Sequence, residues 1–141
     1  MAEFKYQQQI DGLIKSGLTL PELFSPNGLT AFRFAFKDDK EKNHLPVSVI
    51  NPSRVLPDDL KFSGYALSCY DDEQKAVFRY KNLCKLNKKM RLTLGDSLCY
   101  GKLENNDGLI SEIETFSRHF DFYEYANCDL SKTFTIKRIL L

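Results

Sequence analysis

Two charged residues interrupt apolar stretches of this 141-residue chain, and each has a side chain suited to chemistry. Arg33 lies among phenylalanines in the segment 30–36, and Glu124 lies among aromatic residues in the segment 120–126. A guanidinium fork binds a phosphate or a carboxylate through paired hydrogen bonds. A carboxylate whose protonation is tuned by its surroundings can act as a base or stabilise a developing cation. Arg33 and Glu124 are therefore the first candidates for a functional site.

The alternation of side chains in the two segments is typical of strands and assigns each candidate to a face. Arg33 lies on the face opposite the phenylalanines of its segment, where it points either to solvent or into a cleft. Glu124 shares a side with the phenylalanines of its own segment, so it faces inward if those rings do. The alternative for Glu124 is an edge position with an ion pair to a nearby arginine such as Arg118 or Arg138.

Five basic residues near the middle of the chain follow one another without an intervening acid. They are Lys81, Lys85, Lys88, Lys89 and Arg91. Cations favour both a helix C-terminus and solvent, which would explain the run without a ligand. The same charges would also suit contacts with a phosphate backbone. Both interpretations of the basic run remain open at the level of the sequence.

Several recognisable catalytic motifs are missing. The sequence contains no G-x-S-x-G, G-x-x-x-x-G-K-[ST], G-x-G-x-x-G or H-E-x-x-H, which excludes the familiar hydrolase, P-loop, dinucleotide and zinc-protease signatures. His44 and His119 lie far apart in the chain, and we expect His44 at the surface. The cysteines are Cys69, Cys84, Cys99 and Cys128. They include no C-x-x-C pair, so we predict buried reduced thiols and no metal site.

The composition is that of a globular domain. With 43% apolar residues, 28% charged residues and a formal net charge of +1, the chain is expected to form one domain over residues 1–141. Charges interrupt every apolar stretch well before the roughly 18 to 20 residues that a membrane-spanning helix needs. The first residues have neither a secretory signal nor a lipidation motif. We therefore predict a cytoplasmic protein without a membrane partner.

In the first half of the chain, the sequence predicts helices followed by strands. One helix is expected over 3–16, and a short one from the capping box at Thr19 through Phe24. Strands are expected over 30–36, 46–50 and 65–70. The charged segment 37–43 is expected to be a loop.

The amphipathic helix at 71–86 is the clearest element, because apolar residues recur at three- and four-residue steps and acids stand at its start. Further strands are expected over 91–94, 97–103, 120–126 and 132–140, with a turn over 105–108. Helices come first, and mostly strands follow around one good helix. This order predicts an α+β domain with N-terminal helices and a mixed, largely antiparallel sheet.

The order of three residues resembles a known fold. Arg33 lies on an early strand, Ser68 near the end of a strand that leads into a helix, and Glu124 on a late strand followed by a terminal strand. This order resembles the Arg, Ser, Glu arrangement of the ADP-ribosyltransferase-like fold. The resemblance covers roughly residues 30–140.

The resemblance implies an enzyme that uses NAD as its substrate. Arg33 would hold an NAD phosphate or the nearby ribose, and Ser68 would support the carboxylate and the nicotinamide ribose. Glu124 would bind the ribose 2′-hydroxyl and stabilise the oxocarbenium-like transition state as nicotinamide leaves. Tyr70 or Tyr80 would stack on nicotinamide.

Two positions depart from the pattern of that family. Its Ser-Thr-Ser motif is Leu67-Ser68-Cys69 here, with a single hydroxyl. Phe122, two residues before the glutamate, replaces the Glu or Gln of members that modify arginine, asparagine or Rho proteins. The macromolecular acceptor is therefore left open, and hydrolysis of NAD is an alternative to transfer of ADP-ribose.

The sequence supports three functional hypotheses. The first is an NAD-consuming glycosyltransferase or glycohydrolase that acts as an intracellular toxin or a defence effector. The second is a non-catalytic domain that binds a partner protein through exposed aromatic residues around 116–125. The third is a small nucleic-acid-binding protein that uses the basic run at 81–91.

Overall fold

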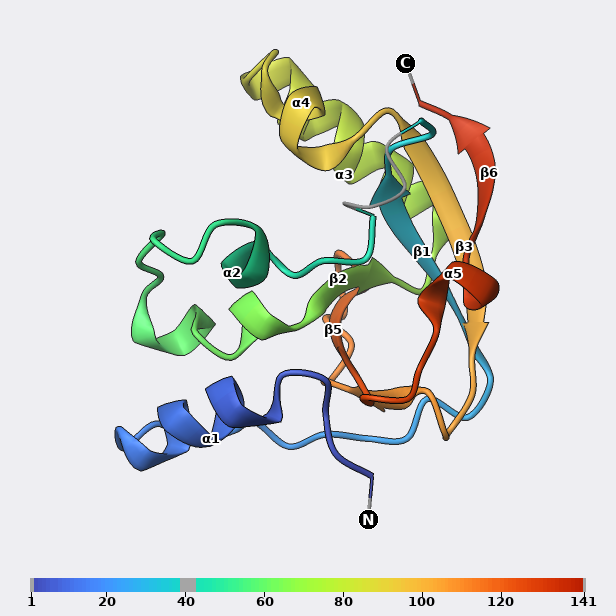
Figure 1. The fold of residues 1–141 in the computed structure, drawn as a ribbon. Helices are drawn as coiled ribbons and strands as arrows, with labels where there is room; N and C mark the ends of the chain where they lie inside the picture. Colours follow the sequence, from blue (N-terminus) through green and yellow to red (C-terminus); the bar gives the residue numbers. More distant parts are fainter. Residues whose placement is uncertain (1, 39–42, 141) are drawn as a thin grey trace.

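A six-stranded sheet with the order β4-β5-β2-β1-β3-β6 forms the centre of the molecule (Figure 1). This computed structural model describes residues 2–38 and 43–140. The strands are β1 (Leu29–Ala35), β2 (Leu67–Tyr70), β3 (Ser97–Leu103), β4 (Gly108–Ile110), β5 (His119–Glu124) and β6 (Thr135–Ile139). Each of the five neighbouring pairs is antiparallel. The predicted α+β class is confirmed.

Helices flank this sheet at several points. They are α1 (Gln7–Lys15), α2 (Val47–Ile50), α3 (Glu73–Leu86), α4 (Met90–Leu94) and α5 (Leu130–Thr133), with the 3-10 turns η2 (Asp58–Leu60) and η3 (Ser63–Tyr65). Figure 1 shows α3 and α4 at one end of the molecule and α1 near the other. In the described part of the chain, no helix has the length and apolar character needed to cross a bilayer.

The amphipathic helix predicted at 71–86 is α3. Asp72 begins it, because its side chain accepts a hydrogen bond of 3.0 Å from the backbone N–H of Lys75. Glu73 adds a negative charge in the first turn, where it favours the helix dipole. The buried side of α3 consists of Ala76, Val77 and Tyr80. This apolar side covers one face of the sheet.

Two segments that were expected to be strands are helical. α2 occupies most of the segment 46–50, and α4 occupies the segment 91–94. Pro46 precedes α2 directly, where its missing backbone donor costs nothing. Gly95, with a φ of 104°, ends α4 in a conformation that favours glycine. Local turn and capping chemistry outweighs strand propensity at both places.

The short helix expected from Thr19 to Phe24 is not formed. Phe24 instead exchanges two backbone hydrogen bonds of 2.8 Å with Ile110. Ile110 belongs to β4, a strand that the sequence analysis did not predict. Backbone bonds to a distant segment therefore replace the bonds that a local helix would have made.

The ends of other predicted elements shift as well. α1 begins at Gln7 and not at residue 3, because Phe4 pairs with Tyr125 beside the end of β5. The last strand, expected over 132–140, is shortened because α5 occupies its first residues. The loop expected over 37–43 lies largely outside the described residues.

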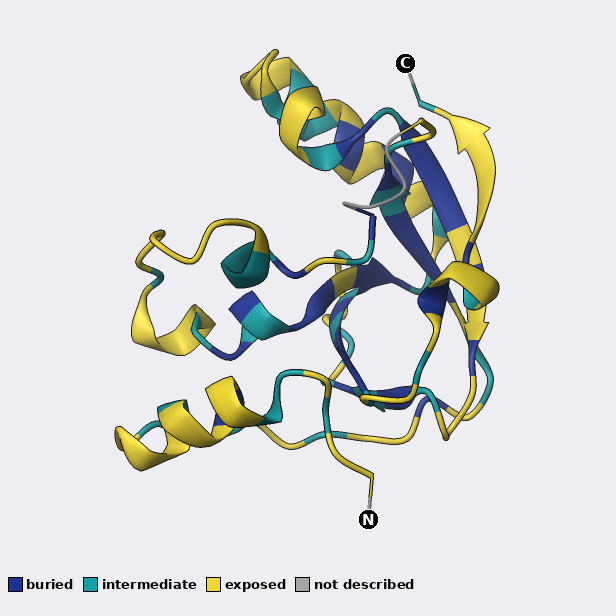
Figure 2. Cartoon of the chain, viewed as in Figure 1, coloured by how far each residue is buried: buried dark blue, intermediate teal, exposed yellow. Residues whose placement is uncertain are grey.

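The sheet has a separate hydrophobic cluster on each face. The face that we call the Arg33 face carries Ala31, Ala35, Leu67, Cys69, Phe120 and Phe122. The opposite face, which we call the α3 face, carries Phe32, Tyr70 and Leu98 beneath α3. Figure 2 shows that β1, β2 and β5 are mainly buried and that β6 is exposed. Strand alternation places Arg33 and Glu124 on the Arg33 face.

Candidate active site

Arg33 is almost fully buried in the middle of β1, with 7% of its surface exposed. Its guanidinium donates from Nη1 to the backbone carbonyl of Ser68 over 3.0 Å and from Nη2 to the backbone carbonyl of Asn43 over 2.7 Å. Neither partner is a carboxylate, so these contacts do not neutralise the charge. The two carbonyls hold the fork in one orientation and leave its positive charge for an anion.

Asn43 is a buried residue whose side chain fixes its own backbone next to β1. Its Oδ1 accepts from the backbone N–H of Phe36 over 2.6 Å, and its Nδ2 donates to the Phe36 carbonyl over 2.9 Å. The amide thus satisfies both backbone groups of the residue that follows the strand. Asn43 positions Arg33 in this way, although no sequence pattern indicated such a role.

Glu124 ends β5 on the same face as Arg33 and is 3% exposed. Its Oε2 lies 3.3 Å from the Nζ of Lys5. Lys5 reaches it because the N-terminal segment runs along the end of β5, where the Lys5 backbone N–H donates to the Glu124 carbonyl over 3.0 Å. Burial raises the pKa of the Glu124 carboxyl, and the charges of Lys5 and Arg33 oppose that rise.

The arginines considered as partners of Glu124 lie elsewhere. Arg118 binds Asp71 through two hydrogen bonds of 2.8 and 2.5 Å, and the Nη1 of Arg138 lies 3.6 Å from Glu73. The partner of Glu124 is Lys5, which no sequence pattern indicated. Residues 3–16 have a helical pattern of apolar residues. This local pattern gave no sign that the first residues pair with the end of β5 as an extended segment.

His44 approaches the same charges from the segment that follows β1. Its ring stacks on Phe134 with 5.5 Å between the ring centroids. Burial lowers the pKa of His44 to about 4; the charges of Arg33 and Lys5 act in the same direction, and Asp129 acts against them. The imidazole is therefore neutral at neutral pH. His44 is half-buried, and its expected surface position is wrong.

Three buried polar atoms in this region have no hydrogen-bond partner among the described residues. They are Arg33 Nε, His44 Nδ1 and Glu124 Oε1. Buried polar groups in folded proteins almost always have a partner, and exceptions require an explanation such as a catalytic role or a missing ligand. We call Lys5, Arg33, His44 and Glu124 the Arg33 cluster. The two cations suit a negatively charged group on a ligand. The carboxylate suits another atom of the same ligand at which positive charge develops during a reaction.

Ser68 brings its backbone to the Arg33 cluster, but not its hydroxyl. The register of β1 and β2 places the Ser68 side chain on the α3 face, where its Oγ lies 2.7 Å from the Nε2 of His119. Cys69 faces Arg33 in its place. Burial raises the pKa of the Cys69 thiol to about 12, against the opposing charge of Arg33. The structure thus brings Arg33 and Glu124 to one face and leaves the Ser68 hydroxyl on the other.

Ser63, Ser68, His119 and Asp121 form a second polar group, which we call the His119 cluster. Asp121 accepts a hydrogen bond of 2.6 Å from Ser63, and its other oxygen lies 3.8 Å from the Nε2 of His119. A catalytic triad needs the serine and the carboxylate on opposite ring nitrogens, whereas both groups approach Nε2 here. The His119 cluster is therefore a hydrogen-bonded network without triad geometry.

The two tyrosines considered for stacking on nicotinamide lie in the core between the sheet and α3. Tyr70 is 5% exposed and Tyr80 is 2% exposed. The ring of Phe34 contacts both, with centroid separations of 5.6 and 5.4 Å respectively. The Tyr80 hydroxyl donates to the carbonyl of Gly95 over 2.7 Å. The structure brings neither ring to the Arg33 face.

The aromatic residues around 116–125 do not form the surface patch that was expected for a partner protein. Phe120, Phe122 and Tyr123 are at most 1% exposed, and only Phe116, at 82%, stands clear of this group. Alternation along β5 sends these buried rings into the clusters on the two sides of the sheet. This correction removes the main support for the second functional hypothesis.

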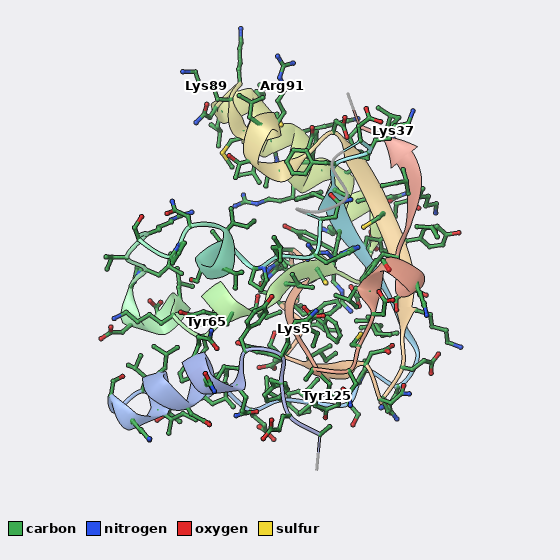
Figure 3. The ribbon with its side chains drawn as sticks, in the orientation of Figure 1. Lys5, Lys37, Tyr65, Lys89, Arg91 and Tyr125 are labelled. Carbon is green, nitrogen blue, oxygen red and sulfur yellow. The ribbon has the colours of Figure 1, made fainter. Side chains whose placement is uncertain are left out.

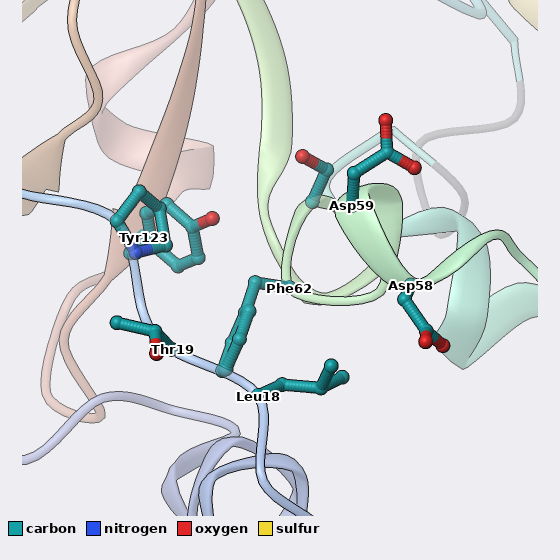
Figure 4. A pocket seen from close by; sticks show the side chains of 8 residues that line it. Leu18, Thr19, Asp58, Asp59, Phe62 and Tyr123 are labelled. Carbon is teal, nitrogen blue, oxygen red and sulfur yellow. The ribbon is translucent and has the colours of Figure 1, made fainter.

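A cavity of about 290 Å³ lies outside the Arg33 cluster, beneath the segment that follows α1 (Figure 4). Figure 4 shows Leu18 and Thr19 on one side of it and Asp58 and Asp59 on the other. Tyr123 also lines the cavity, and burial raises the pKa of its hydroxyl. Strand alternation separates this cavity from Glu124, because Tyr123 points away from the Arg33 face.

Comparison with known protein families, with curated proteins and with solved structures finds no match for this chain. Within residues 2–38 and 43–140, the fold also gathers no group of three or more His, Cys, Asp or Glu side chains that could hold a metal ion. The function is therefore inferred from the Arg33 cluster itself.

Proposed function

We propose that this chain is an NAD-consuming enzyme similar to the ADP-ribosyltransferases, with Arg33 and Glu124 as its central residues. One observation carries the proposal. These two residues come from distant parts of the sequence and lie buried on one face of the sheet, and each has a polar atom without a partner among the described residues. Such atoms are what a polar ligand would satisfy on binding.

Arg33 supplies the anion-binding part of the proposed site. Its contacts with two carbonyls orient the guanidinium without neutralising it, and Nε–H has no partner in the described part of the chain. A phosphate of NAD, or the ribose beside it, would accept from these remaining donors. Lys5, whose side chain is 42% exposed, adds a second positive charge at the edge of the cluster.

Glu124 supplies the carboxylate at the reacting carbon. The bond between ribose C1′ and the nicotinamide nitrogen breaks, and its electron pair leaves with neutral nicotinamide. The carboxylate binds the 2′-hydroxyl and stabilises the positive charge that develops on the ribose. An acceptor hydroxyl or amine, or water, then bonds to C1′ and loses its proton.

Lys5 takes the supporting role that the family resemblance assigned to Ser68. The Ser68 hydroxyl is bound to His119 on the α3 face, whereas the Lys5 ammonium contacts Glu124 directly. Burial raises the pKa of Glu124, and the Lys5 charge opposes that rise and so favours the ionised carboxylate that this role needs. NAD must displace part of this contact to reach Glu124. Consumption of a shared dinucleotide would suit an intracellular toxin or a defence effector with a macromolecular acceptor.

Release of nicotinamide from NAD tests the proposal. The purified chain should release nicotinamide, measured by liquid chromatography, and Glu124→Gln should lower the rate by about 10²- to 10³-fold, as expected for one electrostatic stabiliser. Glu112→Gln is the matched control, because Glu112 is exposed and outside the cluster. Circular dichroism confirms that both variants fold. Absence of nicotinamide release by the wild-type chain, or full activity of Glu124→Gln, would contradict the proposal.

A further inference from the structure

Charge is unevenly distributed along this chain. Residues 74–95 contain seven basic residues and no acid, whereas the other thirteen basic residues and all nineteen acids lie elsewhere. The seven are Lys75, Arg79, Lys81, Lys85, Lys88, Lys89 and Arg91, and all are exposed. A chain with a formal charge of +1 therefore concentrates +7 in residues 74–95, which cover α3 after its first residue, α4 and the turn between them.

The outer side of α3 combines these cations with an exposed aromatic ring. Phe78 is 66% exposed, and on the same side of the helix Lys75 precedes it by three residues, while Lys81 and Lys85 follow it by three and seven residues. None of these three lysines forms an ion pair with another described residue. Figure 3 shows that Lys89 and Arg91 extend the positive surface beyond the end of α3.

A groove of about 960 Å³ runs beside this surface, between α3 and β6. Phe32, Val77 and Phe78 provide its apolar lining, and Gln74 adds an amide. Lys81 supplies a cation to the same groove. The groove therefore places apolar area, a polar amide and positive charge next to one another.

The groove also contains Asp71, Asp72 and Glu73, but each acid is already engaged. Asp71 is bound by Arg118, and Asp72 caps α3. Glu73 pairs with both Lys137 and Arg138. The charges along α3 that form no ion pair with a described residue are therefore all basic, and the surface as a whole attracts an anion.

We infer that the groove between α3 and β6, together with the basic side of α3, binds single-stranded nucleic acid. Phe78 would stack on an unpaired base, since base stacking on an exposed ring is independent of sequence. Lys81 and Lys85 would contact successive phosphates, and Gln74 would reach a base edge. A duplex offers no free base face to Phe78, so single strands fit this surface better. The inference does not depend on NAD turnover.

Fluorescence anisotropy with labelled dT15 and rU15 tests this inference on the whole chain. We expect binding that weakens as salt rises, because phosphate contacts release counterions. The Lys81→Gln, Lys85→Gln double variant should reduce the log–log salt slope by about 1.4, since each phosphate contact on a single strand contributes about 0.7. Phe78→Ala should weaken binding about tenfold and leave the slope unchanged.

Lys102→Gln and Lys132→Gln are matched controls, because both lysines are exposed but lie away from α3. Both controls should bind as the wild-type chain does. No binding of either oligonucleotide at 50 mM salt would overturn the inference. Equal affinity for a duplex of the same length, for polyglutamate or for phosphatidylserine vesicles, with no effect of Phe78→Ala, would overturn it as well, because it would reveal a general anion-binding surface.

Discussion

The Arg33 cluster and the His119 cluster lie on opposite faces of the same sheet, yet they differ in how completely their polar atoms are paired. In the His119 cluster, Ser63 donates to Asp121, and Ser68 and His119 lie within hydrogen-bond distance. In the Arg33 cluster, three buried polar atoms have no partner among the described residues. Each cluster contains a histidine and a carboxylate, but only in the His119 cluster do neighbouring hydroxyls supply hydrogen-bond partners to both.

This difference separates a structural polar network from a candidate active site. A network whose members satisfy one another gains little from a ligand, because binding would have to break existing hydrogen bonds. A cluster that buries unpaired atoms is destabilising by itself, and such a cost is retained where function requires it. The conspicuous serine and histidine contact is therefore the less informative of the two sites.

Among the substitutions that test the two clusters, Arg33→Met should have the largest effect on stability and on nicotinamide release. It removes the donor from the buried carbonyl of Asn43 and from the partly buried carbonyl of Ser68, at about 1–3 kcal/mol each. We expect the free energy of unfolding, measured in urea, to fall by about 2–4 kcal/mol, and nicotinamide release to be lost. Arg33→Lys should keep the charge but not the fork, and should recover only part of the stability. Unchanged stability of Arg33→Met would show that the fork does not hold the two segments.

A pH series on His44→Gln should show the next largest effect. The pKa of His44 is about 4 in the folded chain and 6.5 as its ordinary value. Between these values the unfolded chain binds a proton that the folded chain does not, so stability falls as the pH falls from 6.5 to 4. His44→Gln should reduce this loss by about 1–2 kcal/mol, less than the full shift because the ring is partly exposed.

Urea unfolding at pH 7 and pH 4.5 measures this difference. His119→Gln is the control from the other face, where burial also lowers the pKa of the imidazole but Asp121 opposes the shift. We expect a smaller change in acid sensitivity for that variant. If His44→Gln and the wild-type chain lose the same stability on acidification, partial burial does not lower the pKa of His44.

Asp121→Asn should have the smallest effect of the three substitutions, and this effect should be on stability alone. It weakens the bond from Ser63 and removes the charge near His119, which we expect to lower the free energy of unfolding by about 1 kcal/mol. Nicotinamide release should remain at the wild-type level, since Asp121 lies on the α3 face. A loss of release as large as that of Glu124→Gln would instead assign the chemistry to the His119 cluster.

Much of the fold could be predicted from local patterns. Alternation identified β1 and β5 and placed Glu124 on the side of the phenylalanines, and helical spacing identified α3. The same patterns failed where distant backbone decided the outcome. β4 is a strand because it pairs with β5, and the segment at Phe24 is extended because it pairs with Ile110 of β4; neither has a strong local signal.

The candidate site divides in the same way. The sequence alone determined that Arg33 and Glu124 are charged groups in apolar strands. Residue type and strand alternation are enough for this, because both depend only on neighbours in the chain. The tertiary structure alone decided that Lys5 and Asn43 join them and that Ser68 turns away from Arg33. These placements depend on strand register and on pairing between remote segments. A shift of one residue in register exchanges the two faces of a strand.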